Sequence, residues 1–253
     1  MDLKEFFTRH RRLALALSGG VDSSYLFCEV LRCGVDVKAY FVKSAFQPEF
    51  EWRDVERLVS GLGGRLTVVQ VDVLACREVR ENPSDRCYFC KLKLFRTLLD
   101  RAKEDGYDTI VDGTNASDSV DDRPGMKALQ ELGVLSPLRL CGLTKSVIRE
   151  RSRHLGLFTW DKPAYACLAT RVPVGMEITA DLLDKVERAE RVFLDQGFRD
   201  FRVRIIDRDT AKIQILEEEF FQLIEKKNRI IKEMGGLFEH ILLDLEGRSE
   251  RTN

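Results

Sequence analysis

The feature that most constrains this chain is a glycine-rich turn between an apolar run and a helical pattern near its N-terminus. Residues 13–17 read Leu-Ala-Leu-Ala-Leu, which is typical of a short buried strand. The turn that follows reads Ser18-Gly19-Gly20-Val21-Asp22-Ser23-Ser24. Apolar residues at helical spacing continue to Cys33, and Gly34 is suited to end the helix. Such a turn aims backbone N–H groups and the positive end of the helix at one point, so it predicts a phosphate-binding loop.

The side chains of the turn support the same prediction. Ser18 and Ser23 offer hydroxyl donors, and Asp22 is placed to hold Mg²⁺ against the phosphates. The lysine of a Walker loop is absent, which argues against a site of the kinase or motor type. The predicted nucleotide-binding residues of the turn are Ser18, Gly19, Gly20, Asp22, Ser23 and Ser24.

Strand-like and helical segments alternate through the first two thirds of the chain. Strands are expected at 35–42, 65–73 and 109–112. Helices are expected at 48–62, 87–103, 126–132 and 144–155. This alternation predicts parallel βαβ units, and therefore an α/β fold with a doubly wound parallel sheet.

The pattern changes in the last third of the chain. Residues 160–175 contain two prolines and no periodicity, so a long loop is expected there. The segments expected beyond it are a helix at 179–196, strands at 201–206 and 211–216, a helix at 217–234 and a last strand at 237–245. We therefore predict a nucleotide-binding domain at 1–170 and a smaller α+β domain at 171–253.

Composition and charge argue against several classes of protein. The chain has 41 basic and 42 acidic residues, whereas a dedicated nucleic-acid binder usually has a basic surplus. No apolar run reaches the roughly 18 residues of a membrane span, and the N-terminus does not resemble a signal peptide. We expect a cytoplasmic protein. Its seven cysteines would not form a disulfide framework there, so clustered ones are expected to be ligands or nucleophiles.

A second polar stretch follows the strand expected at 109–112. It reads Asp112-Gly113-Thr114-Asn115, and Asp118 follows. Polar groups at the carboxyl end of a parallel strand lie where ligands of doubly wound folds bind. Together with the first turn, this stretch resembles the PP-loop ATP pyrophosphatases, which have an adenine nucleotide alpha hydrolase-like fold. The resemblance implies that Gly113 and Asn115 bind nucleotide, that Asp118 binds Mg²⁺-pyrophosphate and that Ser44 contacts adenosine.

Members of this superfamily cleave ATP to AMP and pyrophosphate, usually to activate a carboxylate or carbonyl as its adenylate. A carboxylate resists nucleophiles because of its negative charge. Joining it to AMP removes that charge and installs a good leaving group. The resemblance therefore implies an enzyme that uses ATP and Mg²⁺ to adenylate its substrate.

The cysteines divide into two groups. Cys87 and Cys90 form a C-x-x-C at a helix start, where the helix N-terminus and neighbouring basic residues acidify thiols. With Cys167, in the loop 162–171, they suit a [4Fe–4S] cluster with one open iron that carries an extra sulfide. A zinc site and a redox disulfide are alternatives, although zinc needs a fourth ligand and the chain has three histidines. The four other cysteines are expected to be small buried residues: Cys28, Cys33, Cys76 and Cys141.

Several further stretches resemble the LarE family, the ATP-dependent sulfur transferases of nickel-pincer nucleotide synthesis. They are 86–91, Thr144-Lys145 ahead of Ile148-Arg149, 162–171, 186–190 and 201–204. The resemblance implies that the substrate is pyridinium-3,5-biscarboxylic acid mononucleotide and that its carboxylates are adenylated and converted to thiocarboxylates. The product leads to the cofactor of lactate racemase. The resemblance also implies a hexamer, a trimer of dimers.

Cys167 matches the cysteine that donates its own sulfur in single-cysteine members of this family. Because this chain also has Cys87 and Cys90, we predict that Cys167 ligates the cluster and that sulfide, supplied by a sulfur donor, is the nucleophile. The resemblance also suggests five substrate-binding residues: Arg123, Arg171, Glu190, Arg202 and Arg204. The last two are two apart on a strand, so both face one way and suit a phosphate. Glu190 matches a family acid, although a charged helix favours a surface position.

Three other functions stay open at the level of sequence. A tRNA thiolase of the same superfamily also adenylates and inserts sulfur, but the neutral charge argues against it. An amide-forming synthetase would leave the C-x-x-C without a role. A nucleotide-binding regulatory module or iron–sulfur carrier would release no pyrophosphate.

Overall fold

The computed structural model describes residues 1–118 and 124–248. These residues form two compact units, which are described separately. The first contains Met1–Val73 and Asp85–Lys162, and the second contains Leu74–Ser84 and residues 163–248. Of the described helices, none has the length and apolar character needed to cross a bilayer.

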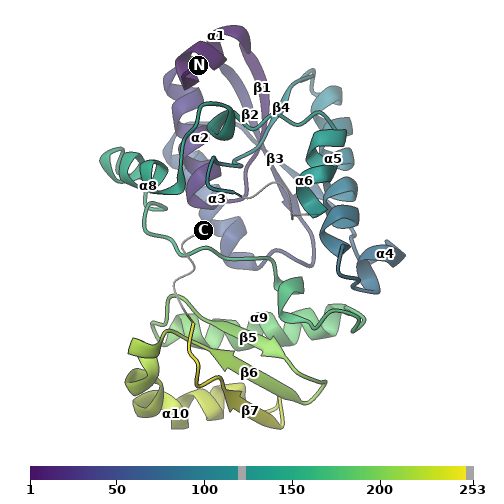
Figure 1. The fold of residues 1–253 in the computed structure, drawn as a ribbon, viewed down its shortest axis with the longest axis vertical. Helices are drawn as coiled ribbons and strands as arrows, with labels where there is room; N and C mark the ends of the chain where they lie inside the picture. Colours follow the sequence, from purple (N-terminus) through teal and green to yellow (C-terminus); the bar gives the residue numbers. More distant parts are fainter. Residues whose placement is uncertain (119–123, 249–253) are drawn as a thin grey trace. The chain divides into compact units, whose positions relative to one another are not determined.

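In the described part of the first unit, four parallel strands form one sheet in the order β3-β2-β1-β4 (Figure 1). The strands are β1 Arg12–Ala16, β2 Asp36–Lys43, β3 Leu66–Gln70 and β4 Ile110–Val111. The register pairs Leu13 with Val37 and Leu15 with Val111. The chain winds from β1 to β3 in one direction and then returns to β4 on the other side of β1. The predicted doubly wound parallel sheet is confirmed.

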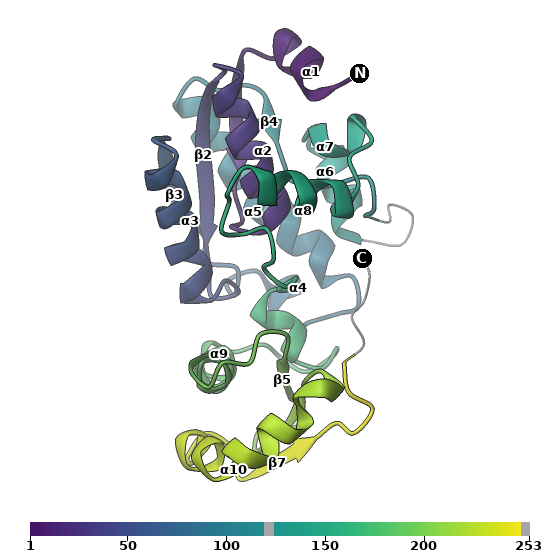
Figure 2. The ribbon, with the colours of Figure 1, turned by 90° about the vertical axis from the view of Figure 1, so that its left-hand side faces the viewer.

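Most helices of the first unit match the predicted segments within a few residues. They are α2 Val21–Arg32, α3 Glu49–Gly61, α5 Arg86–Glu104, α6 Pro124–Glu131 and α8 Lys145–His154. Two short helices were not predicted, α1 Leu3–Arg9 and α7 Pro137–Leu140. The start of α1 is capped by Asp2, whose carboxylate accepts the backbone N–H of Glu5 at 2.8 Å. Helix α8 packs against α2 (Figure 2).

Alternate residues of β1 and β2 face two different layers of helices. Leu13, Leu15 and Val37 belong to the apolar core that also contains buried residues of α2 and α3. On the other face, Tyr40 donates a hydrogen bond at 2.8 Å to Asp105, the residue that follows α5. Right-handed crossovers in opposite directions from β1 require this placement of α2 and α5 on opposite faces of the sheet.

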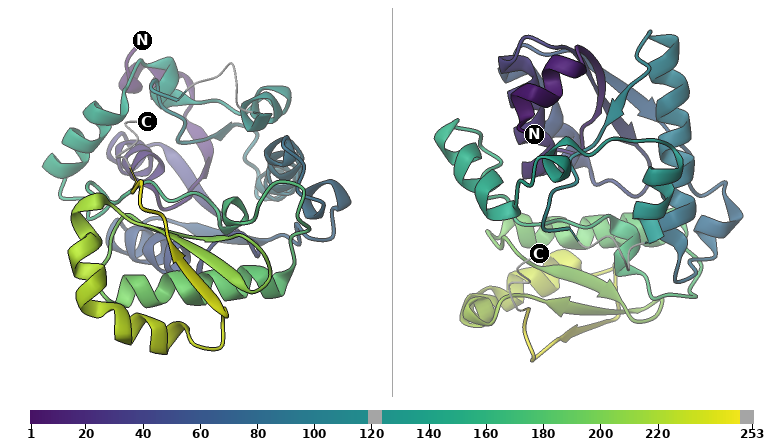
Figure 3. Two further views of the ribbon diagram at one scale, coloured as in Figure 1. Left: turned by 60° about the horizontal axis from the view of Figure 1, so that its bottom comes forward. Right: turned by 45° about the horizontal axis from the view of Figure 1, so that its top comes forward.

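The second unit contains a smaller sheet with the order β5-β6-β7 within the described residues. The strands are β5 Arg202–Ile205, β6 Thr210–Gln214 and β7 His240–Leu243, and the helices are α4 Arg77–Arg80, η1 Leu168–Arg171, α9 Ala180–Asp195, η2 Glu217–Glu219 and α10 Phe220–Met234. Strands β5 and β6 are antiparallel, as their short connection requires, whereas β6 and β7 are parallel. Helix α9 packs against β5, and α10 packs against α9 (Figure 3).

Segment 74–84 joins the second unit through Asn82, a contact that local sequence does not reveal. Asn82 is fully buried and has a left-handed backbone, with φ of 55°. Its side-chain amide donates to the carbonyl of Pro173 at 2.7 Å, and its own carbonyl accepts the N–H of Gly175 at 2.9 Å. Asparagine adopts this backbone conformation more readily than most residues. These bonds fix segment 74–84 to the chain that follows η1.

Candidate active site

The phosphate loop between β1 and α2 depends on close backbone packing at Gly19. This residue has φ of +77°, and a Cβ there would lie 3.0 Å from Val55 Cγ2 and 3.3 Å from the carbonyl of Glu51. Gly20 is the N-cap of α2 and provides no side-chain hydrogen bond to its first turn. The N–H groups at the start of α2 therefore stay available for an anion.

Ser18 and Ser23 close the loop on itself. Their hydroxyl oxygens are 3.0 Å apart, and the Ser23 hydroxyl also accepts the N–H of Ser18 at 3.2 Å. Ser24 differs from them because it is fully buried and its hydroxyl has no hydrogen-bond partner among the described residues. Ser18 and Ser23 line the cavity beside the loop, and Ser24 does not.

Asp22 combines one paired with one unpaired carboxylate oxygen. Its Oδ2 accepts a hydrogen bond from the ammonium of Lys145, the first residue of α8. Its Oδ1 is buried and has no partner among the described residues. Burial raises the pKa of the Asp22 carboxyl, and Lys145 opposes that shift. A buried, unpartnered carboxylate oxygen is suited to a cation.

A cavity of about 350 Å³ lies at the carboxyl ends of β1, β2 and β4, beside α5. It is within the size range of small-molecule sites. The point where the winding reverses, between β1 and β4, is where doubly wound sheets bind ligands. The polar residues of its wall are Ser18, Asp22, Ser23, Tyr40, Gln47, Glu51, Lys91, Asp112, Thr114 and Asp118.

The Asp112 stretch contacts the phosphate loop from the neighbouring strand. A Cβ at Gly113 would lie 2.7 Å from the backbone nitrogen of Ser23, so only glycine allows this approach. Asp118 lines the cavity, and its charge raises the pKa of Asp22. Two carboxylates that repel each other across a cavity are suited to a shared divalent cation.

Asn115 and Ser44 shape turns instead of lining the cavity. The carboxamide oxygen of Asn115 accepts the N–H of Ser117 at 2.7 Å, and its own N–H donates to Asp118 Oδ2 at 3.0 Å. The hydroxyl of Ser44 donates to Gln47 Oε1 at 2.6 Å. Gln47 forms part of the cavity wall in place of Ser44.

Three lysines near the loop were not among the predicted site residues. Lys145 pairs with Asp22, as described above. Lys162 donates to Asp54 Oδ2 at 2.6 Å and to the carbonyl of Gly19 at 3.2 Å. Lys91 lines the cavity. All three lie in stretches that resemble the LarE family, but only the folded chain shows that they meet the phosphate loop or its cavity.

Cys87 and Cys90 lie at the N-terminal end of α5, where Cys87 is exposed and Cys90 is buried. Cys87 lies on the same face of the helix as Lys91 and Leu94, which line the cavity, because these residues follow at intervals of four and three. The guanidinium of Arg86 is 3.8 Å from the Cys87 sulfur. The N-terminal turn of α5 therefore presents a thiol on the helix face that lines the cavity further along, although Cys87 is not itself a lining residue.

The third cysteine, Cys167, belongs to the second unit, where it is the N-cap of η1. Within residues 1–118 and 124–248, no three cysteine, histidine or acidic side chains are gathered as around a metal ion. The seven cysteines, all of which lie within these residues, form no disulfide bond. Of the four expected to be buried, Cys28 is buried. For Cys33, Cys76 and Cys141 that expectation is wrong, because they are half-buried.

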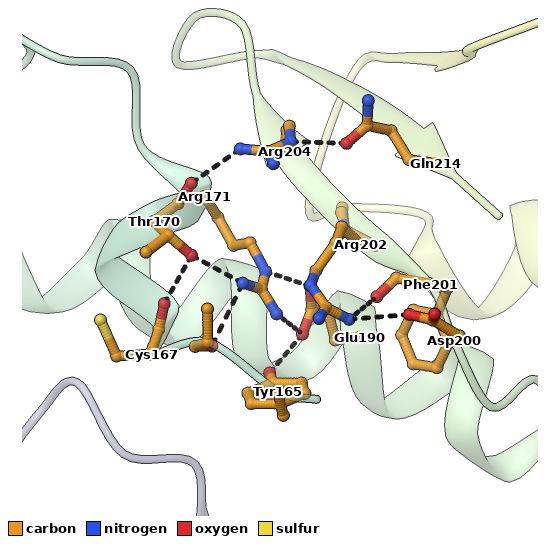
Figure 4. A network of polar contacts seen from close by, with 12 residues as sticks. Tyr165, Cys167, Thr170, Arg171, Glu190, Asp200, Phe201, Arg202, Arg204 and Gln214 are labelled. Carbon is orange, nitrogen blue, oxygen red and sulfur yellow. Dashed lines mark hydrogen bonds and ion pairs between the residues drawn. The ribbon is translucent and has the colours of Figure 1, made fainter. Parts of the chain in front are cut away.

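The predicted substrate-binding residues of the second unit form a network around the Cys167 loop (Figure 4). Arg171 and Glu190 are both 2% exposed and form an ion pair with an N–O distance of 2.6 Å. The expected surface position of Glu190 is wrong: it falls within the apolar stripe of α9, between Val186 and Phe193. Arg123, also predicted for substrate, lies outside the described residues.

Two arginines of β5 point their guanidinium groups at backbone carbonyls of the same network. Arg202 is buried and donates to the carbonyl of Ala164. Arg204 is half-buried and donates to the carbonyl of Thr170 at 2.9 Å and to Gln214. Burial lowers the pKa of Arg202 to about 10.

A doubly wound sheet with a glycine phosphate loop, an Asp-Gly-Thr-Asn stretch and a cavity between them defines a PP-loop ATP pyrophosphatase. The family model described as "Thiamine biosynthesis protein (ThiI)" matches residues 7–191. An uncharacterized protein of Synechocystis sp. is 35% identical over 97% of this chain and 93% of its own length. The pyridinium-3,5-bisthiocarboxylic acid mononucleotide synthase of Lactiplantibacillus plantarum is 31% identical over 96% of this chain and 89% of its own. A GMP synthase of Thermus thermophilus is 29% identical over 72% of this chain. The matched region is 40% of the length of that synthase.

The chain therefore belongs to the LarE family, within the broader ThiI-type group of PP-loop proteins. It is an ATP-dependent sulfurtransferase.

Proposed function

We propose that this enzyme converts the carboxylates of pyridinium-3,5-biscarboxylic acid mononucleotide to thiocarboxylates, a step in the synthesis of the nickel-pincer nucleotide of lactate racemase. The proposal is supported by the 31% identity, over nearly the whole chain, to a synthase of the bisthiocarboxylic acid mononucleotide. The observation that carries it is the cavity beside the phosphate loop, lined by Asp22 and Asp118. Each conversion has two halves, and separate parts of the chain support each half.

In the first half, a substrate carboxylate oxygen attacks the α-phosphorus of ATP, and pyrophosphate leaves with the electron pair of the broken P–O bond. N–H groups at the start of α2 and the hydroxyls of Ser18 and Ser23 would hold the leaving pyrophosphate. The unpartnered Oδ1 of Asp22 and the nearby Asp118 fit a Mg²⁺ ion, which would neutralise phosphate charge when bound. Lys145 adds a fixed positive charge beside them.

In the second half, a sulfur nucleophile attacks the carbonyl carbon of the adenylate, and AMP leaves with the oxygen it received. We propose that Cys87, Cys90 and Cys167 ligate a [4Fe–4S] cluster. Their thiols fit it in donor chemistry, and Cys87 and Cys90 lie within about one turn of α5. Such a cluster, when bound, supplies the sulfur as a sulfide on an iron without a protein ligand. Sulfide then has to be delivered by a donor between turnovers.

The substrate phosphate would be bound by arginines of the second unit. Arg202 and Arg204 are two apart on β5, so both side chains lie on one face of the strand. Arg204 is half-buried and therefore within reach of a ligand. Arg123, outside the described residues, is proposed to neutralise substrate or pyrophosphate charge.

We also propose that the chain acts in the cytoplasm as a homo-oligomer, a hexamer of the trimer-of-dimers kind. ATP and free thiols belong to a reducing compartment. Helix α10 has exposed apolar residues at helical spacing, Phe221, Ile224 and Ile231, which suit subunit contacts. Light scattering on the purified protein would measure the subunit number.

Mass spectrometry after incubation tests the proposed reaction. The protein, reconstituted anaerobically with iron and sulfide, is mixed with ATP, Mg²⁺ and the dicarboxylate nucleotide. The expected product has sulfur in place of carboxylate oxygen, with AMP and pyrophosphate released and the protein mass unchanged. A protein that loses one sulfur per product would show that Cys167 is sacrificed instead, and thiolation of tRNA in place of the nucleotide would overturn the proposed substrate.

A further inference from the structure

The carboxylate of Glu190 is fully occupied inside the second unit. Its Oε1 accepts the Nε–H of Arg171 at 2.6 Å and the backbone N–H of Val203 at 2.9 Å. Its Oε2 accepts Nη2 of Arg171 at 3.2 Å and the hydroxyl of Tyr165. A carboxylate has about four acceptor positions, so these bonds use its capacity for a substrate or a metal ion.

Arg171, held by Glu190, forms hydrogen bonds that hold the backbone on both sides of Cys167. Its Nη1 donates to the carbonyl of Ala166 at 3.2 Å and to the hydroxyl oxygen of Thr170 at 2.7 Å. That hydroxyl in turn donates to the carbonyl of Cys167 at 2.8 Å. The residues before and after the cysteine are therefore held through one guanidinium group.

Tyr165 provides a second connection from Glu190 to the loop. Its hydroxyl donates a hydrogen bond to Glu190. The centre of its ring lies 4.7 Å from the guanidinium carbon of Arg171 and 5.3 Å from that of Arg202. In Figure 4 the sulfur of Cys167 points away from this cluster. The network thus fixes the backbone that carries this thiol.

We infer that Glu190 is a positioning residue, which acts through Arg171 and Tyr165 to fix Cys167 for the sulfur-transfer half of the reaction, and that it does not bind substrate. A buried ion pair contributes little net stability compared with apolar side chains of similar size. Its value here is the fixed geometry of the loop. The inference rests on the proposed function for the step it serves, but its effect on the Cys167 loop does not depend on that function.

Glu190→Gln and Tyr165→Phe test the inference, with Asp184→Asn as the matched control. Gln keeps the size of Glu190 but turns an amide donor or a neutral oxygen toward Arg171. Phe keeps the ring of Tyr165 and removes one hydrogen bond, and it serves if Glu190→Gln does not fold. Asp184 lies on the same helix in an exposed ion pair with Arg188, with side chains 66% and 63% exposed.

Three quantities are measured for each variant: alkylation of Cys167 by peptide mapping, substrate-dependent pyrophosphate release, and thiocarboxylate formation. We expect Glu190→Gln to raise the alkylation rate of Cys167 and to lower thiocarboxylate formation about 100-fold, the cost of a misplacement of about 1 Å. Pyrophosphate release in the first turnover, which precedes sulfur transfer, and its KM for substrate should stay within about twofold. Tyr165→Phe should change the alkylation rate and thiocarboxylate formation in the same directions but by less, and Asp184→Asn should change none of the three quantities.

An unchanged alkylation rate in both Glu190→Gln and Tyr165→Phe would overturn the inference. A rise in the KM for substrate in parallel with lost product would do so too, because Glu190 would then contact substrate. If the wild-type protein releases no pyrophosphate with the dicarboxylate nucleotide, the proposed function fails. The alkylation measurement still decides the positioning role in that case.

Discussion

The phosphate loop of the first unit and the Cys167 loop of the second hold their functional groups in opposite ways. Within the part of the chain that the structure describes, the phosphate loop leaves polar atoms without internal partners, above all Oδ1 of Asp22. In the Cys167 loop, Arg171 and Glu190 satisfy each other and the surrounding backbone. The first arrangement is completed by a ligand, whereas the second is already complete.

This difference has energetic consequences. A buried acceptor without a partner costs about 1–3 kcal/mol of folding free energy, which a bound cation can recover. A buried ion pair is expensive to break on one side only, because the remaining charge has no compensation. Substitutions in the phosphate loop should therefore act mainly on activity, and substitutions in the Arg171–Glu190 pair should act on stability as well.

The largest effect is expected from Asp22→Asn. Loss of the carboxylate proposed to hold Mg²⁺ would weaken neutralisation of the developing phosphate charge, so substrate-dependent pyrophosphate release should fall on the order of 100- to 1000-fold. The urea midpoint should change little, because burial already penalises the charged form of Asp22. Coupled release assays and urea unfolding measure the two quantities. If the variant releases pyrophosphate at the normal rate, Asp22 has no role in the proposed active site.

Arg171→Met should destabilise the protein by about 3–5 kcal/mol, because it leaves the Glu190 carboxylate buried and unpaired. Combining it with Glu190→Met should recover most of the loss, since apolar side chains of similar size replace the pair. Urea unfolding of the single and double variants measures both changes. A single variant as stable as wild type would contradict the contrast between the two loops.

The pH dependence of nucleotide binding with Mg²⁺ should report Asp22. Burial raises the pKa of this carboxyl above 3.8, so it takes up a proton at a higher pH than an ordinary aspartate. The folded unit binds this proton more tightly than the unfolded chain. The contribution of the protonated Asp22 to the stability of the fold is thus present at low pH, and it is lost as pH rises from 3.8 through the raised pKa. Binding measured by calorimetry should weaken on acidification in that window, and Asp22→Asn should lack this dependence.

The smallest effect is expected from Asp184→Asn, which breaks the exposed ion pair that Asp184 forms with Arg188 on the same helix as Glu190. Exposed pairs contribute roughly 0–1 kcal/mol, so the unfolding free energy should change by less than about 0.5 kcal/mol. A loss comparable to that of Arg171→Met would mean that burial does not explain the difference in stability between the Asp184–Arg188 pair and the Arg171–Glu190 pair.

The fold of the first unit and its phosphate loop could be predicted because their signals are local. Alternating apolar residues, paired glycines and the Gly34 stop each act over a few positions, and Gly34 does adopt a left-handed backbone with φ of 65°. Their spacing predicted β1, the loop and α2 in order. Helix α1 was missed even though Leu3, Phe6 and Phe7 have helical spacing and are buried.

The rest depends on contacts between distant parts of the sequence. Lys145 forms a hydrogen bond with Asp22, which is 123 residues away in the sequence, and Asn82 forms one with Pro173, which is 91 residues away. No local sequence pattern predicts either pair. Glu190 is different. It lies four residues after Val186 and three before Phe193, so the apolar periodicity of α9 already marked it as buried. A charged residue within an apolar stripe was the signal for the ion pair with Arg171.

Transfer of oxygen from substrate to AMP tests adenylation by the first unit most directly. The dicarboxylate nucleotide is labelled with ¹⁸O in its carboxylates and incubated with the enzyme, ATP, Mg²⁺ and a sulfide source, and the AMP is examined by mass spectrometry. Label should appear in the AMP phosphate in step with thiocarboxylate formation, because the carboxylate oxygen leaves with AMP. Thiocarboxylate formed with unlabelled AMP, or with ADP and phosphate as products, would contradict adenylation at this loop.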